Sequence, residues 1–181
     1  DRTGVKVNGE LCDELREPKY AHLELERRWL VDAASRPLLE GRSATVIEDR
    51  YIDNTRMRLR RMTRQDVGEV ICKLTKKYEC AYRSARPIVT SYLTGSEYAA
   101  LCVLPAQELV KRRDRLPLGG RIWSLDVFQG RLAGLSMVEC EAEDAAALGA
   151  LVPPDWALRE VTHLPQWQCG ALAKAGAIPE G

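Results

Sequence analysis

Pairs of like charges recur in five stretches of this 181-residue chain. They are Glu24 and Glu26, Arg58 and Arg60, Lys73 and Lys77, Lys111 and Arg113, and Glu139 and Glu141. Because residues two or four apart share one face of a β-strand, each pair predicts a strand with a charged face. If these faces turned inward, the carboxylates could hold a divalent cation and the basic side chains could hold an oligophosphate.

The same faces turned outward would form an ordinary solvated surface, as on many antiparallel sheets. Periodicity alone leaves both orientations open. The charges are nevertheless segregated along the chain, with nine basic and three acidic residues over 50–77 and four acidic residues over 139–144. The net charge of +1 indicates no particular partner.

Eight segments have the alternation or composition of strands, and short turns separate them. They cover residues 22–31, 44–53, 56–61, 70–78, 88–93, 108–115, 121–128 and 136–142. Short helices are predicted over 94–104, 143–151 and 166–174, the first opening on the capping pattern of Thr94 and Glu97. The predicted fold class is α+β, mostly β: a closed eight-stranded antiparallel β-barrel with a few flanking helices, because closure removes sheet edges.

Length and composition suit one folded domain. Hydrophobic residues make up 45% and charged residues 29%, which excludes a disordered chain. We predict an N-terminal arm over 1–20 and one domain over 21–181. No apolar run is long enough to span a membrane, and residues 1–22 lack a signal-peptide core, so we expect a cytoplasmic protein that does not bind membranes. The oligomeric state stays open.

The cysteines do not form a metal-binding pattern. The six residues, Cys12, Cys72, Cys80, Cys102, Cys140 and Cys169, include no C-x-x-C pair. The chain has only two histidines, so a zinc site is disfavoured. Isolated cysteines in a cytosolic protein pack as small hydrophobic residues, and we expect free, mostly buried thiols.

Seven segments follow one another in an order that a known family shares. They are LELERRWLV at 23–31, RYIDNTRMRLRR at 50–61, KLTKKY at 73–78, YLTGSEYAAL at 92–101, VKRR at 110–113, WSLDVFQGRLAGLSMVECEAE at 123–143 and REVTHLPQWQCGALAKAG at 159–176. The first resembles E-x-E-x-K and the second Y-x-D-T…L-R-x-R. Over about residues 22–176 the chain is thus similar to the CYTH superfamily, the triphosphate tunnel metalloenzymes.

The resemblance implies a tunnel in which a triphosphate-containing small molecule is hydrolysed or cyclised with Mg²⁺ or Mn²⁺. Carried over by position, the metal ligands would be Glu24, Glu26, Glu139 and Glu141. The phosphate-binding residues would be Arg58, Arg60, Lys73, Lys77, Lys111 and Arg113. Arg28, in the place of the motif lysine, and Tyr51 would be the catalytic residues.

Three differences from the family pattern bear on activity. An arginine at position 28 can bind phosphate but cannot act as a base, which leaves Tyr51 as the candidate to orient water, unless it is a half-buried strand aromatic. Ile88 and Thr90 replace an acidic pair, so we expect one metal ion rather than two, or weaker binding. Asp126 would either compensate for the missing acids or have a turn-capping or ion-pairing role. Trp167 and Cys169 replace a Y-x-N motif.

Several functions therefore stay open. We favour a metal-dependent triphosphatase that acts on tripolyphosphate or on an organic triphosphate, such as thiamine triphosphate or a nucleotide. The missing acidic pair and Arg28 favour instead a catalytically weak barrel that binds polyphosphate or nucleotide. A class IV-type adenylyl cyclase is a further alternative. Nucleic-acid binding through the basic stripe over 56–64 is the least favoured.

Overall fold

The structure is a computed structural model that describes residues 6–7, 10–11, 18–37, 43–78 and 84–180. Most of the predicted arm over 1–20 therefore lies outside the described residues. Within it, β1 (Lys6–Val7) and β2 (Glu10–Leu11) pair in a small antiparallel sheet of their own. The division into an arm and a domain stays a prediction.

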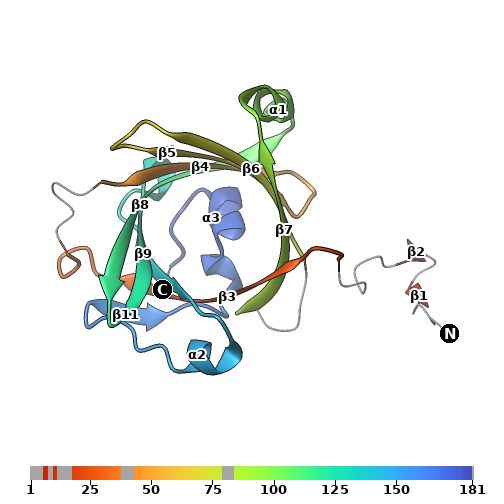
Figure 1. The fold of residues 1–181 in the computed structure, drawn as a ribbon. Coiled ribbons are helices and arrows are strands. Elements are labelled where there is room, and N and C mark those ends of the chain that lie inside the picture. Colours follow the sequence, from red (N-terminus) through yellow and green to blue (C-terminus); the bar gives the residue numbers. More distant parts are fainter. Residues whose placement is uncertain (1–5, 8–9, 12–17, 38–42, 79–83, 181) are drawn as a thin grey trace.

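A closed antiparallel barrel follows, which confirms the predicted fold class (Figure 1). Its strands are β3 (His22–Val31), β4 (Thr45–Ile52), β5 (Met57–Arg64), β6 (Val70–Lys77), β7 (Ala85–Leu93), β8 (Ala106–Leu118), β9 (Arg121–Phe128) and β10 (Ser136–Glu141). The order around the barrel is β10-β9-β8-β4-β5-β6-β7-β3. A further pairing of β10 with β3 closes the ring, so these eight strands leave no open edge.

An additional strand, β11 (Ala157–Glu160), extends the sheet beside β3 and was not predicted. One edge of β3 pairs with β10, while the other pairs first with β7 and then with β11. The sequence ALRE has no apolar alternation, and Leu158 and Arg159 are exposed. Pairing with the edge of β3 beyond β7, rather than any local pattern, therefore makes this segment a strand.

Short helices flank the barrel. They are α1 (Gly95–Leu101), η2 (Gly130–Leu132), α2 (Ala145–Gly149), η3 (Pro165–Trp167) and α3 (Cys169–Ala175). The predicted capping box is confirmed, because the Thr94 side chain accepts from the Glu97 backbone N–H and Glu97 accepts from the Thr94 N–H. Asp144 caps α2 in the same way by accepting from the Ala147 N–H.

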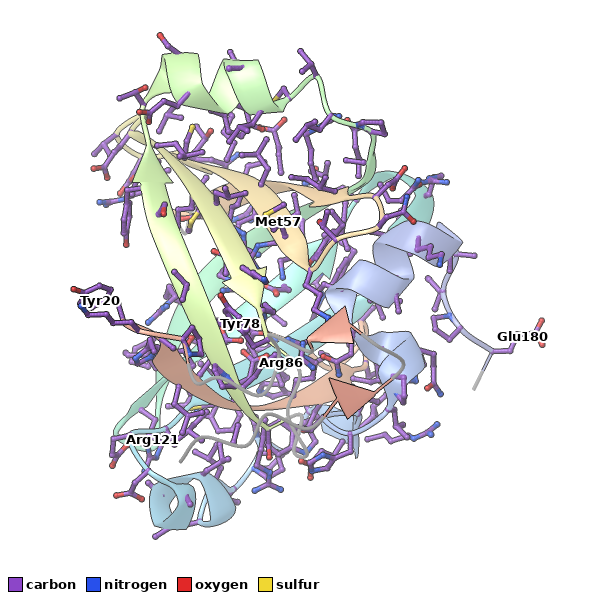
Figure 2. All side chains as sticks on the ribbon, turned by 90° about the vertical axis from the view of Figure 1, so that its right-hand side faces the viewer. Tyr20, Met57, Tyr78, Arg86, Arg121 and Glu180 are labelled. Carbon is purple, nitrogen blue, oxygen red and sulfur yellow. The ribbon has the colours of Figure 1, made fainter. Side chains whose placement is uncertain are left out.

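Two apolar clusters support the barrel from different sides. Beneath α2, Leu148 packs with Trp29, Trp123 and Val138, whose side chains lie on the outer faces of their strands. At one end of the barrel, α3 contributes Leu172 to a second cluster with Phe128. In Figure 1 α3 lies within the outline of the ring, and in Figure 2 it lies at one end of the strands. The apolar contacts thus occupy the outer faces and one end, which leaves the inward faces for polar side chains.

Close packing of α3 against Tyr51 provides a test of this arrangement. A Cβ at Gly170 would lie 3.3 Å from Cδ1 of Tyr51, whereas a Cβ at Gly149 in α2 would meet nothing within 4 Å. Overpacking of this kind costs about 1–3 kcal/mol. We expect Gly170→Val to lower the free energy of unfolding in urea by that amount, and Gly149→Val to change it by less than about 0.5 kcal/mol. Equal stability of the two variants would contradict the packing.

The cysteine prediction is confirmed in part. Cys72 and Cys140 are free and buried, but Cys102 and Cys169 are free and only half-buried. Cys102 is partly accessible because it caps the C-terminus of α1, and Cys169 is partly accessible because it begins α3 and lines the barrel cavity. Cys12 and Cys80 lie outside the described residues.

None of the helices in the described ranges is long and apolar enough to cross a membrane.

Candidate active site in the barrel cavity

A cavity of about 620 Å³ lies inside the barrel. It is lined by every residue selected from the sequence, namely Glu24, Glu26, Arg28, Tyr51, Arg58, Arg60, Lys73, Lys77, Lys111, Arg113, Glu139 and Glu141. The charged strand faces therefore turn inward, and the alternative of a solvated outer surface is wrong for these residues. Strand alternation also placed Lys77, and not Lys76, on the inner face.

Positive charge predominates in the cavity. Ten Lys and Arg side chains line it against four glutamates. Three of the basic residues, Arg56, Arg86 and Arg115, were not selected from the sequence, although Arg115 follows Arg113 by two residues and so shares its face. An excess of cations over carboxylates suits an anionic ligand that brings more than one negative charge.

Three glutamates form a carboxylate cluster. One oxygen from each of Glu24, Glu26 and Glu141 lies within 4.8 Å of the others. The pairing of β3 with β10 sets Glu26 opposite Glu141, and alternation along β3 adds Glu24. Burial and the charge of Glu139 raise the pKa of Glu26, which means that both disfavour its ionised form. No second cluster of three such ligands occurs in the ranges that the structure describes.

Lys77 is the basic residue that contacts this cluster most directly. Its Nζ donates to Glu24 Oε1 at 2.8 Å. Burial alone would raise the pKa of Glu24, but the charge and hydrogen bond of Lys77 outweigh it, and the pKa of Glu24 is lowered. Glu24 therefore stays ionised.

Glu139 has a different environment from the other three glutamates. It accepts from Arg113 Nη2 at 2.5 Å and from Arg28 Nη2 at 3.2 Å. Although burial favours the neutral acid, the two guanidinium groups hold the pKa of Glu139 well below its usual range. Arg28 also donates to Glu26 at 2.6 Å, so one guanidinium links the carboxylate cluster to Glu139. The metal-ligand role of Glu139 stays a prediction.

Asp126 forms ion pairs, which is one of the roles predicted for it. It accepts from Lys111 Nζ at 2.6 Å and from Arg113 Nε and Nη2 at 2.7 and 2.8 Å. Both Asp126 and Lys111 are buried. Lys111 and Arg113 therefore share the carboxylate of Asp126, and Arg113 has Glu139 as a second partner, so both cations already have carboxylate partners within the protein.

Asp49 was not selected from the sequence as a site residue. It is 1% exposed and accepts from Arg60 Nε and Nη2 at 2.6 and 2.8 Å. Burial would raise the pKa of Asp49, but Arg60 lowers it far below its usual value. Strand alternation could have placed Asp49 on the inner face of β4, because the adjacent Glu48 lies on the outer face. The pairing of Asp49 with Arg60, however, follows only from the register of β4 with β5.

Several cations on β5, β6 and β7 lack a carboxylate of their own. The buried Nε of Arg58 has no hydrogen-bond partner among the described residues and lies 3.8 Å from Asp49, which is already bound to Arg60. Lys73 lies over the ring of Tyr92, 5.1 Å from its centroid. A buried guanidinium N–H without an acceptor is costly, and a phosphate oxygen would satisfy it.

The residues that depart from the family pattern also line the cavity. Ile88 and Thr90 contribute no carboxylate, and the hydroxyl groups of Thr90 and Thr75 form a hydrogen bond with 2.9 Å between their oxygen atoms. The Sγ of Cys169 lies 3.9 Å from Arg28 Nη1. Burial and the neighbouring Cys169 raise the pKa of Tyr51 well above its usual value, so its phenol is a hydrogen-bond donor rather than a base. Trp167 is buried in the cluster at α3.

Comparison with curated proteins finds a relative over part of the chain. The inorganic triphosphatase of Nitrosomonas europaea is 41% identical over 68 residues, which are 36% of this chain and 43% of that protein. The aligned segment thus spans less than half the length of this curated relative. No family model matches the chain.

Solved structures match over most of the chain. A crystal structure of the inorganic triphosphatase NE1496 is 25% identical with a TM-score of 0.55, covering 87% of this chain and 97% of that one. The structure of HpAC1 from Hippeastrum is 11% identical with a TM-score of 0.51, and the match covers 86% of this chain and 97% of that one. At this identity the match shows a shared fold and nothing more. Together with the motif order, the closed barrel and its charged cavity, these likenesses support the assignment of the chain to the CYTH superfamily, the triphosphate tunnel metalloenzymes.

Proposed function

We propose that this protein hydrolyses a triphosphate, either inorganic tripolyphosphate or an organic triphosphate, in the barrel cavity with Mg²⁺ or Mn²⁺. The observation that carries the proposal is one cavity in which a three-glutamate cluster faces cations that lack carboxylate partners. The similarity to proteins named inorganic triphosphatases supports it.

The cluster suits a hard divalent cation. Glu24, Glu26 and Glu141 offer carboxylate oxygens only, which are the ligands that Mg²⁺ and Mn²⁺ prefer. A bound ion would neutralise phosphate oxygens and the developing charge during displacement. One such cluster in the described part of the chain favours one metal ion, as expected from the absence of acids at Ile88 and Thr90.

The cations on β5 and β6 are the best candidates to bind phosphate. A linear triphosphate carries about four to five negative charges near neutral pH, more than one divalent ion neutralises. Arg58 offers its unsatisfied Nε and Lys73 its ammonium group, while the ammonium group of Lys77, which donates one hydrogen bond to Glu24, has two further N–H donors. These groups would hold the phosphates for in-line attack by water.

The paired cations would act mainly by positioning. Arg60, Lys111 and Arg113 are bound to Asp49 and Asp126, which fixes the charged wall before substrate enters. Such preorganised charge stabilises a transition state without reorganisation during the reaction. Arg28 would hold Glu26 and Glu139 in place, and Tyr51 would donate a hydrogen bond.

The outer surface weighs against the nucleic-acid alternative. Arg58 and Arg60 of the basic stripe face the cavity, and the outer Arg61 and Arg64 lie near acidic side chains. Paired surface arginines offer little charge to a nucleic-acid backbone. The cytoplasmic location stays a prediction from the sequence.

A substrate panel tests the proposal. Purified protein is incubated with tripolyphosphate, thiamine triphosphate or nucleoside triphosphates, and released phosphate is measured with Mg²⁺, Mn²⁺ or EDTA. We expect turnover of at least one substrate with a metal ion and none in EDTA, because the phosphate charge then lacks its counter-ion. Tight binding without turnover would favour the weak binding barrel, and cyclic AMP from ATP would favour the cyclase.

A further inference from the structure

Arg86 lies beside the carboxylate cluster, on a strand from which the sequence indicated no charged site residue. It is in β7, lines the cavity and is the Cα partner of Glu24 in the pairing of β3 with β7. Figure 2 shows Arg86 close to Tyr78, whose backbone N–H donates to the neighbouring Pro87. Directly opposite residues in an antiparallel pair have Cβ atoms about 5 Å apart, so the side chains of Arg86 and Glu24 leave the backbone next to each other and enter the same cavity.

Arg86 nevertheless differs from the other arginines at the cluster. Within the described residues its guanidinium forms no hydrogen bond or ion pair, whereas Arg28 contacts both Glu26 and Glu139. Glu24 accepts from Lys77 rather than from Arg86. The cavity thus holds a half-buried guanidinium beside acidic residues without a carboxylate of its own, and such a charge favours an added anion.

We infer that Arg86 is a further phosphate-binding residue, which binds phosphoryl oxygens of the substrate next to the carboxylate cluster. The inference rests on the proposed function, because it takes the anion to be a triphosphate. Arg86 supplies fixed positive charge on a wall that otherwise presents Ile88 and Thr90 to the cavity. A guanidinium can donate two parallel hydrogen bonds to the oxygens of one phosphoryl group, a contact that a metal ion does not supply.

Because Arg86 lies beside the glutamates, its charge has opposite effects on an anion and on a cation. In Arg86→Gln, we expect tripolyphosphate to bind the metal-free protein in EDTA about 10- to 100-fold more weakly by calorimetry, since a charge-assisted contact is lost. Mn²⁺ alone should bind as tightly as to the wild type or up to about fivefold more tightly. A merely structural residue would weaken both.

Two variants make the test independent of folding. Arg86→Lys keeps the charge and should recover part of the tripolyphosphate affinity. Arg61→Gln removes an arginine from the outer face of β5, half-exposed and 3.9 Å from Glu48, and should change neither affinity. Thermal unfolding of all variants checks that each is folded.

Unchanged tripolyphosphate affinity in Arg86→Gln, or parallel loss of tripolyphosphate and Mn²⁺ affinity, overturns the inference. Failure of the proposed function has a different signature: wild-type protein that binds tripolyphosphate but releases no phosphate from any substrate. In that case the affinities still decide the role of Arg86. A wild type that does not bind tripolyphosphate at all overturns both.

Discussion

Glu24→Ala is expected to lower the turnover of the preferred triphosphate more than tenfold and to leave the protein folded. Glu24 is one of three carboxylates in the cluster, and loss of one ligand weakens a metal site with so few acids severely. Folding should change by less than about 1 kcal/mol, because the variant loses the ion pair with the partly exposed Lys77 but also relieves repulsion within the cluster.

The measurement is kcat against metal concentration for the wild type, Glu24→Ala and Glu143→Ala, with unfolding followed in urea. Glu143 is a matched control because it is exposed and pairs with Arg121 outside the cavity. We expect Glu143→Ala to behave as the wild type. Turnover of Glu24→Ala close to that of Glu143→Ala would remove Glu24 from the site.

Asp49→Asn is expected to destabilise the fold by about 3–5 kcal/mol, the cost of leaving a buried charge unpaired. Asp49 and Arg60 are both buried and share two hydrogen bonds. The neutral amide cannot compensate the guanidinium, which cannot lose its proton. The adjacent Glu48→Gln is the control: Glu48 is half-exposed and 3.9 Å from Arg61, and its replacement should cost less than about 0.5 kcal/mol.

The pH dependence has a definite sign. Because Arg60 lowers the pKa of Asp49 below its unfolded value of about 3.9, the stabilisation by Asp49 is fully present above that pH. It is lost as the pH falls through the lower folded pKa. The difference in unfolding free energy between the wild type and Asp49→Asn should therefore shrink on acidification below about pH 4. A constant or growing difference would contradict the ion pair, as would equal stability of the two proteins at pH 7.

Much of the barrel could be predicted because its strands have a strict period of two. The segments from His22 to Val31 and from Val70 to Lys77 place charged side chains on one face of the strand. In a small domain such faces can point inward only if the sheet closes into a barrel with a cavity. Helix α1 was predictable from a local capping pattern. Strand β11 was not, because it depends on the edge of β3, which a window of sequence does not contain.

The site divides in the same way. Alternation along each strand determines which charged side chains share a face, so the membership of the cavity could be derived from sequence and resemblance. The pairing of those charges was decided by register between strands distant in sequence, which sets Asp49 beside Arg60, Asp126 beside Arg113 and Glu141 beside Glu26. Ion pairs act over a few ångströms, and a period of two carries no information about the neighbouring strand. Only the tertiary structure could separate the compensated cations from Arg58 and Arg86.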